Sequence, residues 1–173
     1  MQLVAFAQPS SNRNDTGTHD VTDVGVKTES WKTQELPNLR IRFKLPLGYK
    51  QKQWAVVVGS PPLTEIFQVD HVNQINFAVE DAEGAIPGGA KDIPQKNYID
   101  YKEWSQFIGE RKYIVQTFQG GGVIIDEKGK RLPYCVEAVA AIDAKHLLRV
   151  SATLGNHERQ QEVLAMLKTI EFY

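Results

Sequence analysis

The sequence predicts an α+β fold in which a central, mainly antiparallel β-sheet is sandwiched between helices in an α/β/α arrangement. Several segments have the alternation or the short apolar runs of strands, and two have apolar residues at helical spacing. One strand, at 134–142, is apolar on both faces apart from Glu137, which indicates that layers cover the sheet on both sides. The 173 residues suit one domain with a full core. We expect it to span residues 24–173.

Residues 1–23 are expected to form a disordered tether, because they are polar and offer little to a core. Ala5-Phe6-Ala7 before Gln8 has the small-x-small form of a signal-peptidase site, although no basic region and almost no hydrophobic region precede it. The start is therefore either a remnant of an export signal or a chance match. We favour export, hence a periplasmic or secreted location, with the cytoplasm as the alternative.

Strand signals occupy most of the predicted domain. In LRIRFKL, Leu39, Ile41, Phe43 and Leu45 alternate with charged residues, the period of two of a half-buried strand. Further strands are predicted in WAVVVGS, LTEIFQVD, NQINFAVED, KYIVQTFQ, GVIID, RLPYCVEAVAAID and HLLRVSAT. Residues 70–73 should form a turn between two of them.

A helix is predicted near residues 100–109. Asp100 can cap it, and Glu103 follows at the spacing of a capping box. Gly109 can end it. Its apolar face would carry Tyr101, Trp104, Phe107 and Ile108.

A second helix is predicted near residues 157–168. Asn156 is a suitable N-cap, and Glu158 lies in the first turn, where the helix dipole favours an anion. This placement accounts for the His157-Glu158 pair without any chemistry. The apolar stripe is made by Val163, Leu164, Leu167 and Ile170.

No catalytic or metal site is predicted, and no cofactor. The four histidines are scattered, and the single cysteine, Cys135, forms no intrachain disulfide and lies in a predicted strand, where a half-buried inert thiol is expected. GAIPGGAK has the glycines of a phosphate loop but misplaces its lysine and hydroxyl. Ser60, His71 and Asp70 could form a triad only by chance, since no nucleophile elbow is present.

Two further classes of protein are disfavoured by composition. The 20 basic and 21 acidic residues give a net charge of -1, which offers no electrostatic footprint for nucleic acid. No apolar run approaches the roughly 20 residues that a membrane-spanning helix needs.

Binding to a protein remains the open class. The long Gly/Pro-containing loop at 81–97 is the best candidate contact surface, because a loop of that length in a compact domain is often functional. Large aromatic residues could anchor a partner beside it or lie in the core. The candidate binding residues are Ile86, Lys91, Ile93, Tyr49, Trp54 and Tyr101.

The order of these elements resembles the PsbP-like family. The resemblance covers roughly residues 37–172 and is most specific in FKLPLGY and in the closing VLAMLKTIEF. It implies an α/β/α sandwich and a non-enzymatic role, since such relatives serve as extrinsic subunits of photosynthetic complexes, partners of a small GTPase, envelope lipoproteins or chaperones for secreted effectors. This chain has no cysteine near its N-terminus to carry lipid and no basic N-terminal arm.

The resulting hypothesis is a non-catalytic protein-binding or assembly module with an unidentified protein partner. The alternative is a small ligand-binding protein or hydrolase with a pocket beside the 81–97 loop.

Overall fold

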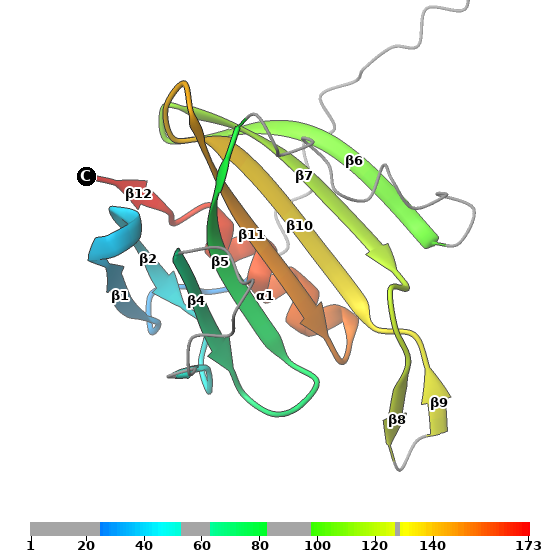
Figure 1. Ribbon diagram of the computed structural model, residues 1–173. Helices are drawn as coiled ribbons and strands as arrows, with labels where there is room; N and C mark the ends of the chain where they lie inside the picture. Colours follow the sequence, from blue (N-terminus) through cyan, green and yellow to red (C-terminus); the bar gives the residue numbers. More distant parts are fainter. Residues whose placement is uncertain (1–24, 53–62, 83–97, 127–128) are drawn as a thin grey trace, which may run out of the picture.

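The computed structural model describes residues 25–52, 63–82, 98–126 and 129–173 (Figure 1). Its largest element is a seven-stranded sheet in the order β3-β4-β5-β11-β10-β7-β6, in which every neighbouring pair is antiparallel. The predicted antiparallel sheet is thus confirmed. The strands are β3 (Lys50–Lys52), β4 (Leu63–Gln68), β5 (Gln74–Asp81), β6 (Ile99–Ile108), β7 (Arg111–Gln119), β10 (Tyr134–Ala141) and β11 (His146–Leu154).

Two smaller sheets accompany it. The first, called the small sheet below, has the order β1-β2-β12 and joins the first two described strands to the last one. The second is the hairpin β8-β9, which Figure 1 shows projecting beyond one end of the large sheet. A short 3-10 helix, Pro37–Leu39, separates β1 from β2. The remaining bounds are β1 (Lys32–Leu36), β2 (Ile41–Leu45), β8 (Ile124–Asp126), β9 (Gly129–Arg131) and β12 (Glu171–Phe172).

The core lies between one face of the large sheet and a second layer made by α1 (His157–Leu167) and the small sheet. Alternate residues of β10, namely Val136, Ala138 and Ala140, are almost fully buried on this side. They belong to the same apolar cluster as Val163 of α1. The period-two alternation of the strands therefore produces the buried face that the sequence predicted.

Three phenylalanines join the small sheet to the large one. Phe43 of β2 stacks on Phe77 of β5 with ring centroids 4.6 Å apart. Phe67 of β4 meets Phe43 and Phe77 edge-on at 5.6 and 5.8 Å. All three side chains are buried, and such aromatic pairs add stability beyond the apolar area that they bury.

The predicted C-terminal helix is confirmed as α1. The Asn156 side chain accepts a hydrogen bond from the backbone N–H of Arg159 at 2.9 Å, and Glu158 occupies the first turn. His157 lies at the helix start, 3.0 Å from the side chain of Gln161 and edge-on to the ring of Tyr134. The His157-Glu158 pair therefore has the structural role expected of it.

The predicted helix near residues 100–109 is wrong, because this segment is the edge strand β6. It pairs antiparallel with β7, and the register shifts at a bulge between Ile99 and Lys102, where Asp100 has a φ of 52°. Beyond the bulge, Trp104 and Ile108 face the core while Phe107 points to the other side and is 73% exposed. The long antiparallel pairing with β7 overrides the local capping signal.

The α/β/α arrangement is also corrected. Among the described residues α1 is the one α-helix, so they show a helix on one face of the sheet rather than a full α/β/α sandwich. The other face of β10 is mixed, since Cys135 and Val139 are buried whereas Ala141 is exposed. No helix in the described ranges is long and apolar enough to cross a membrane.

Candidate functional site

The side of the large sheet that points away from α1, the open face, carries a line of polar side chains. Directly paired residues of five neighbouring strands contribute to it. Because directly opposed residues share a face, their side chains stand next to one another across the sheet. This polar row consists of Glu103 (β6), Gln116 (β7), Glu137 (β10), Ser151 (β11) and Asn76 (β5).

Gln116 is the most buried member of the polar row, at 1% exposure. Its side-chain N–H donates to Glu103 Oε2 at 2.6 Å, and the Tyr101 hydroxyl donates to the same oxygen at 2.8 Å. At the other end of the row, the Gln74 amide donates to Asn76 Oδ1 at 2.7 Å. These bonds hold the side chains at both ends of the row in fixed orientations.

Arg149 lies beside the centre of the row, on β11, and contacts two carboxylates. Its Nε donates to Glu80 Oε1 at 2.8 Å, while its Nη1 lies 3.6 Å from Glu137 Oε2, an ion pair beyond hydrogen-bond distance. All three side chains are no more than a quarter exposed. Partial burial strengthens these charge interactions compared with an exposed pair.

Two buried oxygens of the polar row have no hydrogen-bond donor in the structure. They are Gln116 Oε1 and Glu137 Oε2, on residues that pair directly across β7 and β10. Desolvation of the Glu137 carboxyl raises its pKa to about 7, and the nearby Glu80 charge adds to the effect while Arg149 opposes it. Unsatisfied buried acceptors and a carboxyl with a pKa near neutrality are typical of functional sites.

An aromatic cluster adjoins the polar row. The ring of Phe118 lies 4.2 Å from that of Tyr98 and 6.4 Å from that of Tyr101, measured between centroids. Cys135 packs against this cluster, and its thiol donates to the carbonyl of Gly120 at 3.4 Å. Burial raises the thiol pKa to about 12, so Cys135 is a poor nucleophile at neutral pH, as the sequence predicted.

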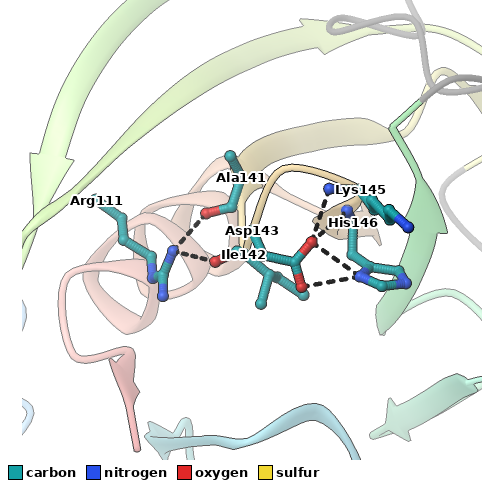
Figure 2. Close-up of polar contacts among 6 residues, drawn as sticks. All are labelled: Arg111, Ala141, Ile142, Asp143, Lys145 and His146. Atoms are coloured by element: carbon teal, nitrogen blue, oxygen red, sulfur yellow. Dashed lines mark hydrogen bonds and ion pairs between the residues drawn. The ribbon is translucent and has the colours of Figure 1, made fainter.

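A histidine and an aspartate meet at the β10–β11 turn, at one end of the sheet (Figure 2). Asp143 Oδ1 lies 2.9 Å from His146 Nδ1 and accepts from the backbone N–H groups of Lys145 and His146. These hydrogen bonds lower the pKa of Asp143. Beside the turn, Arg111 Nη1 donates to the carbonyls of Ala141 and Ile142 at 2.7 and 2.6 Å. The cluster thus closes the turn.

The Asp70-His71 pair also has a structural explanation. Asp70 Oδ1 accepts from the backbone N–H groups of Val72 and Asn73, and Oδ2 accepts from the Asn73 amide, each at 2.8 Å. These bonds form the turn predicted between β4 and β5. Desolvation alone would raise the pKa of the Asp70 carboxyl, but the hydrogen bonds outweigh it and the pKa is lowered. Ser60, the third member of the chance triad, lies outside the described residues.

A hollow of about 230 Å³ lies where the β8-β9 hairpin meets the sheet. It is lined by His71 and Val72 of the β4–β5 turn, by Cys135 and Thr153 of the sheet, and by residues 120–125 and Pro133 beside the hairpin. Its lining offers one imidazole and a thiol of raised pKa, with no activated nucleophile. The apolar side chains of the lining, among them Val72, Val123 and Ile125, suit an apolar group.

The candidate binding residues of the sequence occupy different places. Tyr49 is buried in the core, 5.6 Å below the guanidinium of Arg159, so it takes the core position that was also considered for it. Tyr101 is half-buried in the aromatic cluster of the open face. The structure does not bring these two tyrosines into one site. The other four candidates lie outside the described residues, namely Trp54, Ile86, Lys91 and Ile93. The same holds for the predicted WAVVVGS strand, for residues 83–97 and for the predicted tether.

The described groups also give no metal centre. Among them, no three histidine, cysteine, aspartate or glutamate side chains gather closely enough to hold an ion. The chemistry that the open face offers is recognition of charge and hydrogen-bond donors by Glu80, Gln116, Glu137 and Arg149. The sequence reasoning missed these four residues, although Glu137 stood out as the one charged residue in an otherwise apolar strand.

No protein-family model and no curated protein sequence matches the chain. A solved structure does: the solution structure of cyanobacterial PsbP (CyanoP) from Synechocystis sp. PCC 6803 has a TM-score of 0.52 and 11% sequence identity to it. The match covers 86% of this chain and 96% of the CyanoP chain. At this level of identity the likeness concerns the fold alone. The chain thus has a PsbP-like fold, a mainly antiparallel sheet with one α-helix in its described part.

Proposed function

We propose that the chain is a non-catalytic protein-binding or assembly module and that the β8-β9 hairpin contributes its contact surface. The observation that carries the proposal is the exposure of large apolar side chains on this hairpin. Val123, which directly precedes β8, is 50% exposed and Ile125 is 76% exposed, whereas Ile124 between them is buried. Apolar side chains held in water by a projecting element are typical of partner-binding surfaces.

The surroundings of the hairpin support the same proposal. Val123 and Ile125 both line the hollow of about 230 Å³, so exposed apolar groups stand beside a recess that can receive an apolar anchor from a partner. The hairpin pairs only with itself among the described strands. The two strands can thus engage a partner without disturbing the ladder of the large sheet.

The experiment compares captured partners between matched variants. The tagged full-length chain is used to capture proteins from its native cells, alongside the double variant Val123→Ser/Ile125→Ser and the control Phe107→Ser. Phe107 is equally exposed but lies on β6, away from the hairpin. We expect a stoichiometric partner with the wild type and the control, and at least a tenfold loss with the hairpin variant, as for two central apolar contacts.

A fourth arm tests the surface that the sequence suggested. A chain whose residues 83–97 are replaced by a Gly/Ser linker reports on Ile86, Lys91 and Ile93. Loss of the partner only in this arm would move the contact surface from the hairpin to that segment. A partner retained by every variant, or no partner at all, would contradict the hairpin proposal.

We further propose that the chain works outside the cytoplasm, which the small-x-small motif at Ala5-Phe6-Ala7 supports. A fusion of residues 1–30 to a reporter that is active only after export tests this. We expect reporter activity with the natural motif and its loss when Ala5 and Ala7 are both changed to Asp. Equal activity of the two fusions would contradict the proposal.

A further inference from the structure

The centre of the open face carries an unbalanced charge. Arg149 lies between Glu80 and Glu137, at 2.8 and 3.6 Å from their nearest carboxylate oxygens. When both carboxyls are ionised, this partly buried group of three has two negative charges and one positive charge. A single additional positive charge would make the group neutral. Its attraction to the carboxylates would be stronger than in water, because the group is partly buried.

Two buried oxygens at the same place accept no hydrogen bond. They are Gln116 Oε1 and Glu137 Oε2, although Glu137 Oε2 lies 3.6 Å from Arg149 Nη1. Their residues are directly opposed across β7 and β10. Direct opposition places their Cβ atoms about 5 Å apart. Flipping the Gln116 amide by 180° would not solve the lack of a donor. Its N–H donates to Glu103 Oε2 at 2.6 Å, and a flipped amide would place its oxygen against that carboxylate oxygen. A ligand that donates at least two N–H bonds would satisfy both oxygens.

We propose that this part of the open face binds the primary ammonium group of an organic amine, which donates hydrogen bonds to Gln116 Oε1 and Glu137 Oε2. An ammonium group is compact, carries one charge and has three donors, so it matches both the charge and the acceptors. A bare metal ion matches less well, because no three ligating side chains gather among the described residues. The rings of Tyr98 and Phe118, at 4.2 Å from each other beside the row, offer an apolar surface for the alkyl part.

Binding of an ammonium group competes with protonation of Glu137, whose pKa is raised to about 7. The charged or titratable groups around Glu137 are Arg149 on β11, Glu80 on β5, Cys135 on β10, Tyr98 before β6 and Glu103 on β6. The ammonium favours the carboxylate, so it should lower the pKa of Glu137. By linkage, affinity should rise about tenfold between pH ~6 and ~8.

The test is a titration of the full chain with n-butylammonium chloride, followed by NMR at both pH values. The signals observed are the side-chain amide of Gln116 and the side-chain carboxyl of Glu137. Tetramethylammonium chloride, at the same ionic strength, supplies the charge without N–H donors and controls for screening. We expect saturable shifts of both signals with butylammonium, tighter binding at the higher pH, and no saturable shift with tetramethylammonium.

Two variants locate the site. Glu137→Gln should remove the binding and its pH dependence, while Glu158→Gln, the same charge change at the exposed start of α1, should leave both unchanged. The wild-type comparison of the two salts needs no variant, so the test holds even if Glu137→Gln folds poorly. Equal responses to the two salts, no saturable response, or unchanged binding by folded Glu137→Gln would each overturn the proposal.

A further arm identifies the source of the ammonium group. N-acetyl-lysine methylamide replaces butylammonium as a mimic of a lysine side chain of a protein. Tighter binding of this compound would assign the site to a lysine of a partner, and tighter binding of butylammonium would assign it to a small free amine. The ammonium site uses no residue of the β8-β9 hairpin. A negative result for ammonium binding would therefore not contradict the proposed function.

Discussion

The two faces of the large sheet are built by the same strands but differ in chemistry. On the face toward α1, Phe77 and Val136 are fully buried among other apolar side chains. On the open face, their strand neighbours Asn76 and Glu137 belong to the polar row, which retains two buried acceptors without donors. The first face has the composition that stabilises a fold, whereas the second tolerates polar groups that the fold does not need. This difference assigns stability to the face toward α1, and recognition is the role that we propose for the open face.

The largest expected effect comes from the core face. Phe77→Ala should lower the free energy of unfolding by about 3–5 kcal/mol, because it removes two aromatic contacts and leaves a cavity. Urea denaturation measures the change. The matched control is Ser151→Ala on the open face of β11, where we expect a change within about 0.5 kcal/mol. Similar losses for both variants would break the contrast between the faces.

An intermediate effect should come from Glu137 and depend on pH. Its folded-state pKa of about 7 lies above the ordinary value of 4.5 for a glutamate, so near neutral pH the folded protein holds a proton that the unfolded chain releases. Stability from this group is present below pH 4.5 and is lost as pH rises to about 7. After allowance for the partial exposure of Glu137, we expect a loss of ~2 kcal/mol.

The measurement compares wild type with Glu137→Gln in urea across this pH range. Gln cannot ionise, so the stability of the wild type relative to the variant should fall as pH rises. The ionisable groups other than Glu137 are the same in both proteins, so their contributions cancel in the difference. If the stability difference between the two proteins stayed constant with pH, the pKa of Glu137 would not be raised. The proposal that the open face is a binding site would then lose one of its supports.

The smallest expected effect concerns the helix that covers the core face. Asn156→Ala removes the 2.9 Å capping bond to the Arg159 N–H and should cost about 1 kcal/mol in unfolding free energy. Asn156→Asp keeps an acceptor at this position and should retain most of the stability. Thermal unfolding distinguishes the two variants, and equal losses in both would mean that the side-chain bond does not hold the start of α1.

The sequence predicted α1 well because its signals are local. Asn156, Glu158 and the apolar stripe from Val163 onward all lie within four turns of one helix. Strands such as β10 and β11 were likewise predicted from alternation or apolar runs, and the structure confirms them. These signals need no knowledge of what the segment packs against.

Residues 100–109 show the opposite case. Tyr101 packs with Phe118 on the open face, whereas Trp104 packs against the core, so the large side chains of β6 serve both faces and fall at a three-residue spacing that also suits a helix. Only the pairing with β7 distinguishes the two structures, and pairing is a property of two segments. The helix predicted in place of β6 was one basis for a second helix layer, and the apolar character of both faces of the strand at 134–142 was the other.

The polar row could not be predicted for a similar reason. Gln116 and Glu137 are neighbours only because β7 and β10 pair in one register, and a slip of one residue would place them on opposite faces. The sequence did mark Glu137 as unusual within an apolar strand. It could not show that Gln116 and Arg149 would accompany it.

The strand order of the large sheet has a kinetic consequence. β3-β4-β5 and β6-β7-β10-β11 are each joined by pairings between strands close in sequence, but β5 and β11 pair residues as distant as Gln74 and Thr153. Pairing β5 with β11 closes a long loop and costs chain entropy before the contacts of this pairing form. We therefore expect β3-β4-β5 and β6-β7-β10-β11 to form first and to join late. Until they join, the edges of β5 and β11 stay unpaired, and the nascent chain is most prone to aggregate at that stage.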